Sequence, residues 1–248
     1  MIHSVRSYRI PGGNYYKLYR DLSDLPHLLI AGATGSGKSV TVNGIIHSIL
    51  TTCSPFNAQF VLIDPKKVEL IDYAALPHTA KYAADPDDIV TALEWTMKET
   101  ERRFAVMQQN HVKVYSGSVL YVIIDELADL MVSMKNETLP ILQRIAQIGR
   151  AAQVRIIACS QNIMAQTIPT VLKCNFPAVL GLRTATKAQS RYLIAEPGCE
   201  KLPDPRRAGT AYGYLRDGAD LTRHQLYMWP ESDIQKLIHH WTSAACVA

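Results

Sequence analysis

The stretch Gly-Ala-Thr-Gly-Ser-Gly-Lys-Ser at residues 32–39 decides the fold of this chain. It matches the spacing G-x-x-x-x-G-K-[ST] of a phosphate-binding loop (P-loop) at every required position. Its glycines allow a tight turn in which backbone N–H groups point at an anion, and the following helix presents the positive end of its dipole. We therefore predict that a nucleotide binds to the loop and to the residue after it, namely Gly32, Ala33, Thr34, Gly35, Ser36, Gly37, Lys38, Ser39 and Val40.

The segments on both sides of this loop have the pattern that a P-loop requires. Residues 27–31 form an apolar run typical of a short buried strand, and residues 40–50 carry apolar side chains at helical spacing. Strand-like and helix-like segments then alternate, which predicts an α/β fold with a mostly parallel sheet flanked by helices. Further strands are expected at residues 59–63, 118–124, 154–159 and 178–182, with a terminal pair at 210–215 and 225–229. Further helices are expected at 89–109, at 138–151 with Thr138 as cap and Pro140 in the first turn, at 187–194, and after Pro230.

Length and composition are those of one large α/β domain. The chain has 248 residues, of which 48% are hydrophobic, and this is enough for an ample core. A net charge of +4 permits nucleic-acid binding but is too small to indicate it. The five cysteines are scattered, the N-terminus does not resemble a signal peptide, and no apolar run approaches the ~18 residues of a membrane span. These features predict a soluble, cytoplasmic protein with reduced thiols.

Two adjacent carboxylates follow another predicted strand. Leu120–Ile124 is an apolar run, and Asp125 and Glu126 come directly after it. P-loop ATPases place a metal-binding Asp and a water-activating Glu in this way. We expect Asp125 and Ser39 to hold Mg²⁺, and Glu126 to polarise the attacking water. Lys38 would reach the β and γ phosphates. The guanine-reading motif Asn-Lys-x-Asp does not occur in the sequence, so ATP is favoured over GTP.

Several motifs resemble those of the FtsK/SpoIIIE family of DNA translocases. In the family's order along residues 13–245, they are Leu-Pro-His-Leu-Leu-Ile-Ala-Gly at 25–32, Ile-Asp-Pro-Lys at 63–66, Glu-Arg-Arg at 101–103, Asp-Glu-Leu-Ala-Asp-Leu-Met at 125–131 and Arg-Ala-Ala at 150–152. The resemblance implies a RecA-like P-loop core that assembles into a hexameric ring, hydrolyses ATP between subunits and pulls double-stranded DNA through the central hole. The chain would then consist of an N-terminal attachment at residues 1–25, with an edge strand at 15–20, and a RecA-like ATPase motor domain at residues 26–248.

The resemblance also assigns roles to residues outside the P-loop. Arg150 lies where the family supplies an arginine finger to the neighbouring subunit's γ-phosphate, although an arginine ending a helix is also typical of a dipole cap. Gln161 lies where a polar residue after a strand senses the same phosphate. Residues 160–174 and 184–191 resemble the two pore loops. The DNA contacts expected there, which an ordinary solvated surface would also explain, are Asn162, Lys173, Thr186 and Lys187.

Two segments depart from the family pattern. Asn162 replaces a pore arginine, and residues 203–209 (Pro-Asp-Pro-Arg-Arg-Ala-Gly) replace a Gly-x-Gly-Asp-Met turn expected at the pore rim. A motor from a mobile element, or an excised motor, fits this pattern, with any membrane anchor outside this chain. The second hypothesis is a conjugation-coupling or protein-export ATPase of the same superfamily, although the basic pore loops favour DNA. A nucleotide-dependent scaffold without hydrolysis is disfavoured by Glu126.

Overall fold

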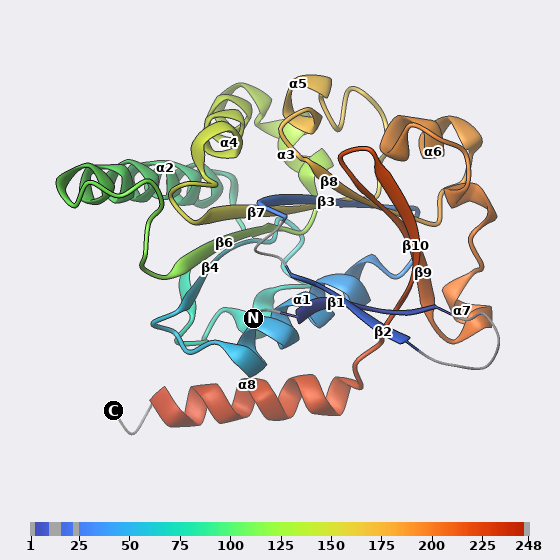
Figure 1. Cartoon of the computed structure of the whole chain (residues 1–248), viewed down its shortest axis with the longest axis horizontal. Coiled ribbons are helices and arrows are strands. Elements are labelled where there is room, and N and C mark those ends of the chain that lie inside the picture. The colour runs from blue at the N-terminus through green and yellow to red at the C-terminus, as the bar shows by residue number, and fades with distance from the viewer. Residues whose placement is uncertain (1–2, 10–15, 22–24, 246–248) are drawn as a thin grey trace.

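An eight-stranded β-sheet forms the centre of the chain (Figure 1). The computed structural model describes residues 3–9, 16–21 and 25–245. In spatial order the strands are β10 (Asp220–Leu226), β9 (Ala211–Asp217), β8 (Ala178–Leu182), β3 (His27–Ala31), β7 (Val154–Ser160), β6 (Val119–Ile124), β4 (Ala58–Ile63) and β5 (Thr79–Ala83). The strands from β8 to β5 are parallel, and β9 and β10 extend the sheet as an antiparallel hairpin. The predicted α/β fold with a mostly parallel sheet is confirmed.

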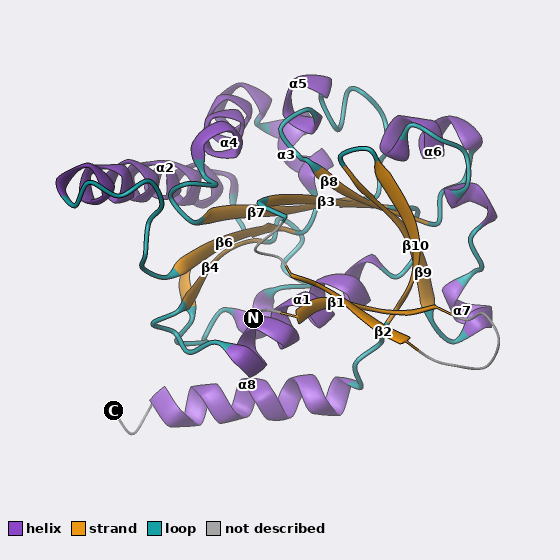
Figure 2. Cartoon of the chain, in the orientation of Figure 1, coloured by secondary structure: helices purple, strands orange, loops and turns teal. Residues whose placement is uncertain are grey.

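Helices cover both faces of this sheet (Figures 1 and 2). One face carries α1 (Lys38–Thr52) and α8 (Glu231–Ala245), and the other carries α2 (Pro86–Gln109), α3 (Leu127–Ser133), α4 (Lys135–Ile148), α5 (Thr170–Lys173) and α6 (Lys187–Ile194). In β3, Leu29 and Ala31 belong to the core under α2 to α6, whereas Leu28 and Ile30 belong to the core under α1. Both faces of the strand are therefore buried, which explains why its sequence is apolar at every one of these positions.

The strand order places the carboxyl ends of β3, β4, β6, β7 and β8 along one edge of the sheet. Ala31 at the end of β3 pairs with Ser160 at the end of β7. After β3 the chain continues to β4, which lies on one side of β3, whereas β8 lies on the other side. The strand order therefore reverses at β3, and open α/β sheets bind ligands at such a switch point. The hairpin returns to the same edge, because Leu226 at the end of β10 pairs with Ala211 at the start of β9.

The helix predicted at residues 138–151 is displaced. α4 begins at Lys135, directly after α3, so the prediction of Thr138 as a cap is wrong. Its hydroxyl lies inside the helix and donates to the carbonyl oxygen of Met134 at 2.9 Å, a bond that competes with capping. Pro140 lies in the second turn, and the helix ends at Ile148. Arg150 therefore lies in the turn after the helix rather than at its last residue.

The terminal pair of strands is displaced as well. The strand predicted at residues 225–229 is β10, which already begins at Asp220 and ends at Leu226. Gly218 and Ala219 connect it to β9, and Gly218 has a φ of 59°, as a tight hairpin turn requires. Glycine as the first of these two turn residues is the local signal for this turn. β5 is a further strand that was not predicted.

The N-terminal residues that are described form a separate two-stranded sheet. β1 (His3–Arg9) pairs antiparallel with β2 (Tyr16–Asp21), so the strand predicted at 15–20 exists but does not border the large sheet. The proposed division at residues 25 and 26 stays a prediction. Within residues 3–9, 16–21 and 25–245, no helix is long and apolar enough to span a membrane.

Candidate nucleotide site

The P-loop connects β3 to α1 and is fixed to the strands on both sides of β3. The N–H of Gly32 donates to the carbonyl oxygen of Ser160 in β7 (3.2 Å), and the N–H of Ala33 donates to that of Arg183 after β8 (2.8 Å). Gly37 has a φ of 98°, and a Cβ atom there would lie 2.4 Å from the Cβ of Ala211 in β9. Only glycine fits this position, because both the backbone conformation and the close approach of β9 exclude a side chain.

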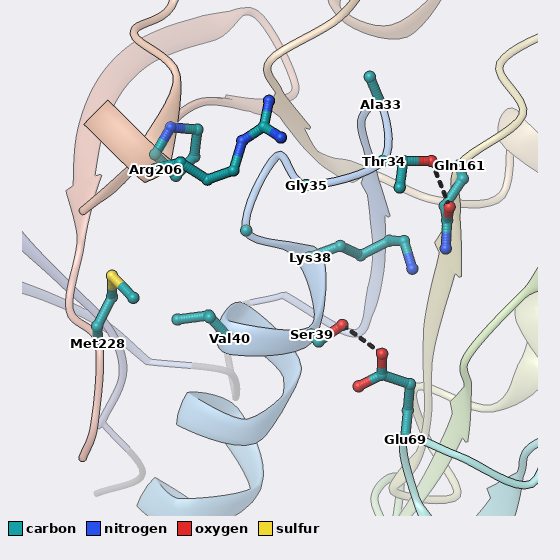
Figure 3. Close-up of a pocket in the computed structure, with 12 residues that line it drawn as sticks. Ala33, Thr34, Gly35, Lys38, Ser39, Val40, Glu69, Gln161, Arg206 and Met228 are labelled. Carbon is teal, nitrogen blue, oxygen red and sulfur yellow. Dashed lines mark hydrogen bonds between the residues drawn. The ribbon is translucent and has the colours of Figure 1, made fainter. Parts of the chain in front are cut away.

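A pocket of about 360 Å³ opens over this loop (Figure 3). Its lining combines P-loop residues with residues from distant parts of the chain: Ala33, Thr34, Gly35, Gly37, Lys38, Ser39, Val40, Glu69, Gln161, Pro205, Arg206 and Met228. We call the part around Thr34, Lys38, Ser39 and Gln161 the phosphate end. At this end the α1 N-terminus, a lysine and a hydroxyl are brought together, and these groups fit a polyphosphate. The predicted nucleotide-binding residues therefore border one pocket or form the turn beneath it.

Lys38 and Asp125 form a buried ion pair beside the loop. Their nitrogen and oxygen atoms are 3.9 Å apart, and only 5% and 4% of the two side chains are exposed. Burial raises the pKa of Asp125 to about 6, with smaller upward contributions from the charges of Glu69, Asp64 and Glu126, while Lys38 opposes the rise. A site in which several carboxylates repel one another in a poorly solvated space favours the arrival of a further cation.

The oxygen donors near this pair fit a magnesium ion. Ser39 donates its hydroxyl to the Oε1 atom of Glu69 at 2.8 Å, and the charge of Glu69 in turn acts on Asp125. Hydroxyl and carboxylate oxygens are ligands that Mg²⁺ prefers, and Mg²⁺ usually completes its shell with water and substrate phosphates. In the part of the chain that the structure describes, no group of three His, Cys, Asp or Glu residues could hold a metal ion unaided. The assignment of Ser39 and Asp125 as metal ligands stays a prediction.

Glu126 is buried and held in place from two directions. Its Oε1 atom accepts hydrogen bonds from the Ser160 hydroxyl (2.9 Å) and from the backbone N–H of Gln161 (3.1 Å), at the end of β7. The Nζ atom of Lys66 lies 3.6 Å from its other oxygen and 3.7 Å from a carboxylate oxygen of Asp129. These contacts leave the carboxylate little rotational freedom, as a water-orienting base requires.

Gln161 links the P-loop to Glu126. Its side-chain Oε1 atom accepts a hydrogen bond from the Thr34 hydroxyl at 2.8 Å (Figure 3). Its backbone N–H donates to the Glu126 carboxylate. A shift of the P-loop can therefore be transmitted to the Glu126 carboxylate through Gln161. Its predicted role as a phosphate sensor stays a prediction, although its location is suitable.

Arg150 lies far from this group of residues. It is exposed, in the turn that precedes β7, whereas Gln161 follows the carboxyl end of the same strand. A seven-residue strand separates the two ends by roughly 20 Å. Arg150 therefore cannot reach the pocket of its own chain.

The predicted DNA contacts fall into two groups. Asn162 follows the end of β7, and Thr186 and Lys187 follow the end of β8; all three are exposed near the edge that carries the P-loop. Thr186 caps α6 through a capping box with Gln189. Lys173 is different, because its amine donates to the carbonyl oxygen of Tyr192 and lies over that ring, and burial lowers its pKa.

Four residues that line the pocket were not predicted from the sequence. Glu69 could have been expected, because it follows the end of β4 at the same sheet edge. Pro205 and Arg206 belong to α7 (Pro205–Ala208), within the segment expected at a pore rim, and Met228 lies between β10 and α8. No local motif marks these three residues, because the return of the β9–β10 hairpin brings them to the P-loop.

Comparison with known proteins agrees with this geometry. Residues 9–119 match the model of the FtsK/SpoIIIE family. The DNA translocase FtsK of Clostridium acetobutylicum is 36% identical over 206 residues, which cover 77% of this chain and 27% of the relative. The chain belongs to the FtsK/SpoIIIE family. It spans about a quarter of the length of the curated FtsK relatives that it matches.

Solved structures share the fold at lower sequence identity. The pCW3 conjugation coupling protein TcpA, in a monomer form with ATPγS, has a TM-score of 0.78 at 22% identity, covering 96% of this chain and 70% of the other. The cytoplasmic domain of the Thermomonospora curvata Type VII secretion ATPase EccC has a TM-score of 0.73 at 20% identity, covering 95% and 30%. The RecA-like P-loop ATPase fold implied by the FtsK/SpoIIIE motifs is confirmed.

Proposed function

We propose that this chain is the motor of an ATP-driven translocase that moves along double-stranded DNA. The observation that carries the proposal is the group of buried Lys38, Asp125 and Glu126 together with half-buried Gln161, which different strand ends bring to one P-loop. Lysine, paired carboxylates and a polar sensor in this arrangement suit hydrolysis rather than mere nucleotide binding. The names of the curated relatives support DNA as the track.

In this proposal each residue has a definite task. Bound ATP supplies the bond to be cleaved, and Mg²⁺ bound with it offsets phosphate charge. Lys38 and the α1 N-terminus bind the phosphates, while Ser39 and Asp125 hold the metal. Glu126, fixed by Ser160 and Lys66, orients a water molecule and accepts its proton.

The site would be completed by a second copy of the chain. Arg150 is exposed at the opposite end of β7 from the pocket, so it can serve only a neighbouring pocket. A closed ring, hexameric as the family resemblance implies, lets every subunit give one arginine and receive one. Each interface would then hold one complete hydrolytic site.

The DNA would lie against the edge that carries Asn162, Thr186 and Lys187. One lysine and two short polar side chains suit contacts to phosphate oxygens, which position a protein on DNA without reading its sequence. The motor would work in the cytoplasm, with any membrane anchor outside this chain.

A second function is supported by the structural neighbours. A conjugation coupling protein and a Type VII secretion ATPase share this fold over nearly the whole chain. An ATPase of that kind would move or recruit a protein substrate, and duplex DNA would not control its rate.

The test compares the ATPase rate of the chain with and without long linear duplex DNA. We expect stimulation by duplexes of unrelated sequence, together with binding that weakens as salt rises. Lys187→Ala should lower the slope of log affinity against log salt by about one, because one lysine no longer neutralises a phosphate. Lys98→Ala, which removes an exposed lysine of α2, is the matched control and should leave the slope unchanged.

An ATPase that is active but indifferent to duplex DNA would favour the protein-moving alternative. Strong dependence on one DNA sequence would contradict phosphate tracking. If Lys187→Ala keeps the wild-type slope of log affinity against log salt, Lys187 does not contact DNA phosphates.

A further inference from the structure

The pocket extends away from the phosphate end to a surface that the hydrolytic residues do not use. Pro205, Arg206 and Met228 line this part, and Figure 3 shows Arg206 and Met228 on the opposite side of the P-loop from Gln161 and Glu69. We call Val40, Pro205, Arg206 and Met228 the nucleoside end. If the P-loop fixes the phosphates, the rest of a nucleotide has to leave the phosphate end in this direction.

The nucleoside end is held firmly by the elements behind it. Ala211 at the start of β9 packs against Gly37, and Pro205 lies 4.0 Å from where a Cβ of Gly37 would be. On the other side, the ring of Trp229 stacks on His47 of α1 with 3.7 Å between centroids. Met228 is the residue before this anchor, and it lines the pocket with 41% of its surface exposed. A thioether side chain is therefore presented on a fixed connection and is open to a ligand.

Arg206 lines the pocket with a guanidinium group that is paired along one edge. Its Nε and Nη2 atoms donate to the two carboxylate oxygens of Asp204 at 3.1 and 2.9 Å, so one edge of the group is occupied. Asp204 also accepts from the backbone N–H of Arg206, which fixes the start of α7. The side chain of Arg206 is 76% exposed. A guanidinium group that is paired along one edge and is largely exposed is suited to stacking on an aromatic ring.

We propose that the nucleoside end is the subsite for the base of a purine nucleoside triphosphate. Arg206 stacks on the base, and Val40, Pro205 and Met228 supply apolar contacts. The inference rests on the proposed function, because it takes ATP binding at the P-loop as given. It assigns to residues 203–209, which depart from the family pattern, a role in holding the nucleotide rather than the DNA.

The test measures binding affinity by calorimetric titration of the full chain, with one probe that contains a base and one that does not. The two probes are a non-hydrolysable ATP analogue and inorganic tripolyphosphate, each with Mg²⁺. Arg206→Ala and Met228→Ala should each weaken binding of the ATP analogue about tenfold, because each removes stacking or apolar surface from the base. Binding of tripolyphosphate should stay within about twofold, a difference of less than half a kcal/mol.

Two further variants sharpen the assignment. Arg206→Lys keeps the charge but has no planar face, so it should lose as much affinity as Arg206→Ala. Arg207→Ala removes the exposed neighbour on the same helix, which does not line the pocket, and should bind both probes like the wild type. Equal thermal unfolding temperatures would show that the variants are folded.

The proposal is overturned if Arg206→Ala and Met228→Ala bind the ATP analogue normally. It is also overturned if Arg206→Ala weakens tripolyphosphate as much as the analogue, because Arg206 would then act on phosphate. Lys38→Ala tells this failure from a failure of the proposed function. If Lys38→Ala binds neither the ATP analogue nor tripolyphosphate, the P-loop is the nucleotide site. If Lys38→Ala binds both normally, the P-loop is not the nucleotide site and the proposed function fails.

Discussion

The two ends of the pocket differ in how they are built. At the phosphate end the reacting groups are buried, and hydrogen bonds connect them across the ends of neighbouring strands. At the nucleoside end Arg206 and Met228 are exposed, and the other two residues are half-buried. Apart from Val40, which belongs to α1, these residues come from short segments on either side of a hairpin. The residues proposed for hydrolysis are thus held by the central strands of the sheet, whereas the residues proposed to contact the base lie at its border.

This difference predicts different consequences for substitution. Loss of a group that acts only in the transition state lowers kcat, whereas loss of uniform contact with substrate raises KM without changing kcat. Changes to the groups proposed to act on the attacking water and on transition-state charge should therefore lower turnover, and changes at the nucleoside end should weaken binding. The predictions below test this contrast, beginning with the largest effect.

Glu126→Gln should give the largest loss. We expect kcat to fall by about 10² to 10⁴, because the residue proposed to accept the proton of water is removed. Glutamine keeps an acceptor for Ser160 and Gln161, so the surrounding geometry and nucleotide binding should survive. The measurement is the steady-state ATPase rate together with the dissociation constant of ATP.

Asp129→Asn is the matched control for this substitution. Asp129 is the other carboxylate near Lys66, at 3.7 Å, and it is half-exposed. Its replacement should leave kcat within about threefold, as expected for an exposed ion pair. A Glu126→Gln protein that keeps more than half its activity would contradict the assignment of the base.

Arg150→Ala should reduce kcat by about 10² to 10³, the usual effect of removing one group that stabilises transition-state charge. In the proposed ring Arg150 serves another copy of the chain, so this loss should depend on which subunit carries the change. Mixing inactive Glu126→Gln and Arg150→Ala proteins creates some interfaces in which an intact Glu126 meets an intact Arg150. Those interfaces should restore part of the ATPase activity.

The mixed sample needs independent proof of assembly, for example by native mass spectrometry. If mixed rings form and no activity returns, Arg150 does not act between subunits. Because β7 separates Arg150 from the pocket of its own chain, Arg150 would then have no role in hydrolysis.

Gly37→Ala tests the joint between the two ends, because Gly37 is where the P-loop meets β9. A methyl group there would clash with Ala211 at 2.4 Å and would also require a φ of 98°. We expect the free energy of unfolding in urea to fall by about 2–3 kcal/mol. Gly35→Ala is the control with a positive φ but no clash, because the nearest atom to its Cβ would be the Nε of Arg206 at 4.0 Å, and it should cost only about 1 kcal/mol. Equal losses would mean that the contact with β9 is unimportant.

The sequence predicts the phosphate end well for a physical reason. The P-loop is contiguous in the chain, and the carboxylates after a buried strand must meet it once the strands are parallel. The adjacent location of Lys38, Asp125 and Gln161 follows from those two facts. The nucleoside end could not be predicted in the same way, since Arg206 and Met228 reach the pocket only through the order of β8, β9 and β10 and the register of a hairpin.

The start of α4 shows a second limit. Thr138 has the residue type of a helix cap, but α4 begins three residues earlier, directly after α3. No side chain caps this helix; the backbone at Met134 makes the turn between the two helices. A search for capping side chains cannot find a helix start that the backbone alone makes. The predicted position of the helix end is displaced in the same way, so Arg150 lies in the turn after α4 instead of ending the helix.

Thr34→Val should give the smallest effect and tests how far the phosphate end acts as one unit. The change removes the hydroxyl that donates to Gln161 at 2.8 Å while keeping the shape of the side chain. A neutral hydrogen bond of this kind is worth about 1 kcal/mol, so kcat should fall about fivefold with little change in ATP affinity.

A double-mutant cycle with Gln161→Ala decides what this small loss means. If Thr34 acts only by holding the Gln161 side chain, the double variant should be no slower than Gln161→Ala alone, because the hydroxyl then has nothing left to orient. Additive losses would show that Thr34 has a separate role toward the phosphates. Thr41→Val serves as the control, because its hydroxyl bonds to the carbonyl oxygen of Gly37 at the start of α1, away from Gln161, and its loss should leave kcat unchanged. The contrast between the two ends predicts coupling for Thr34 and Gln161 and none between either residue and Met228, since the nucleoside end contributes binding without taking part in the sensor contact.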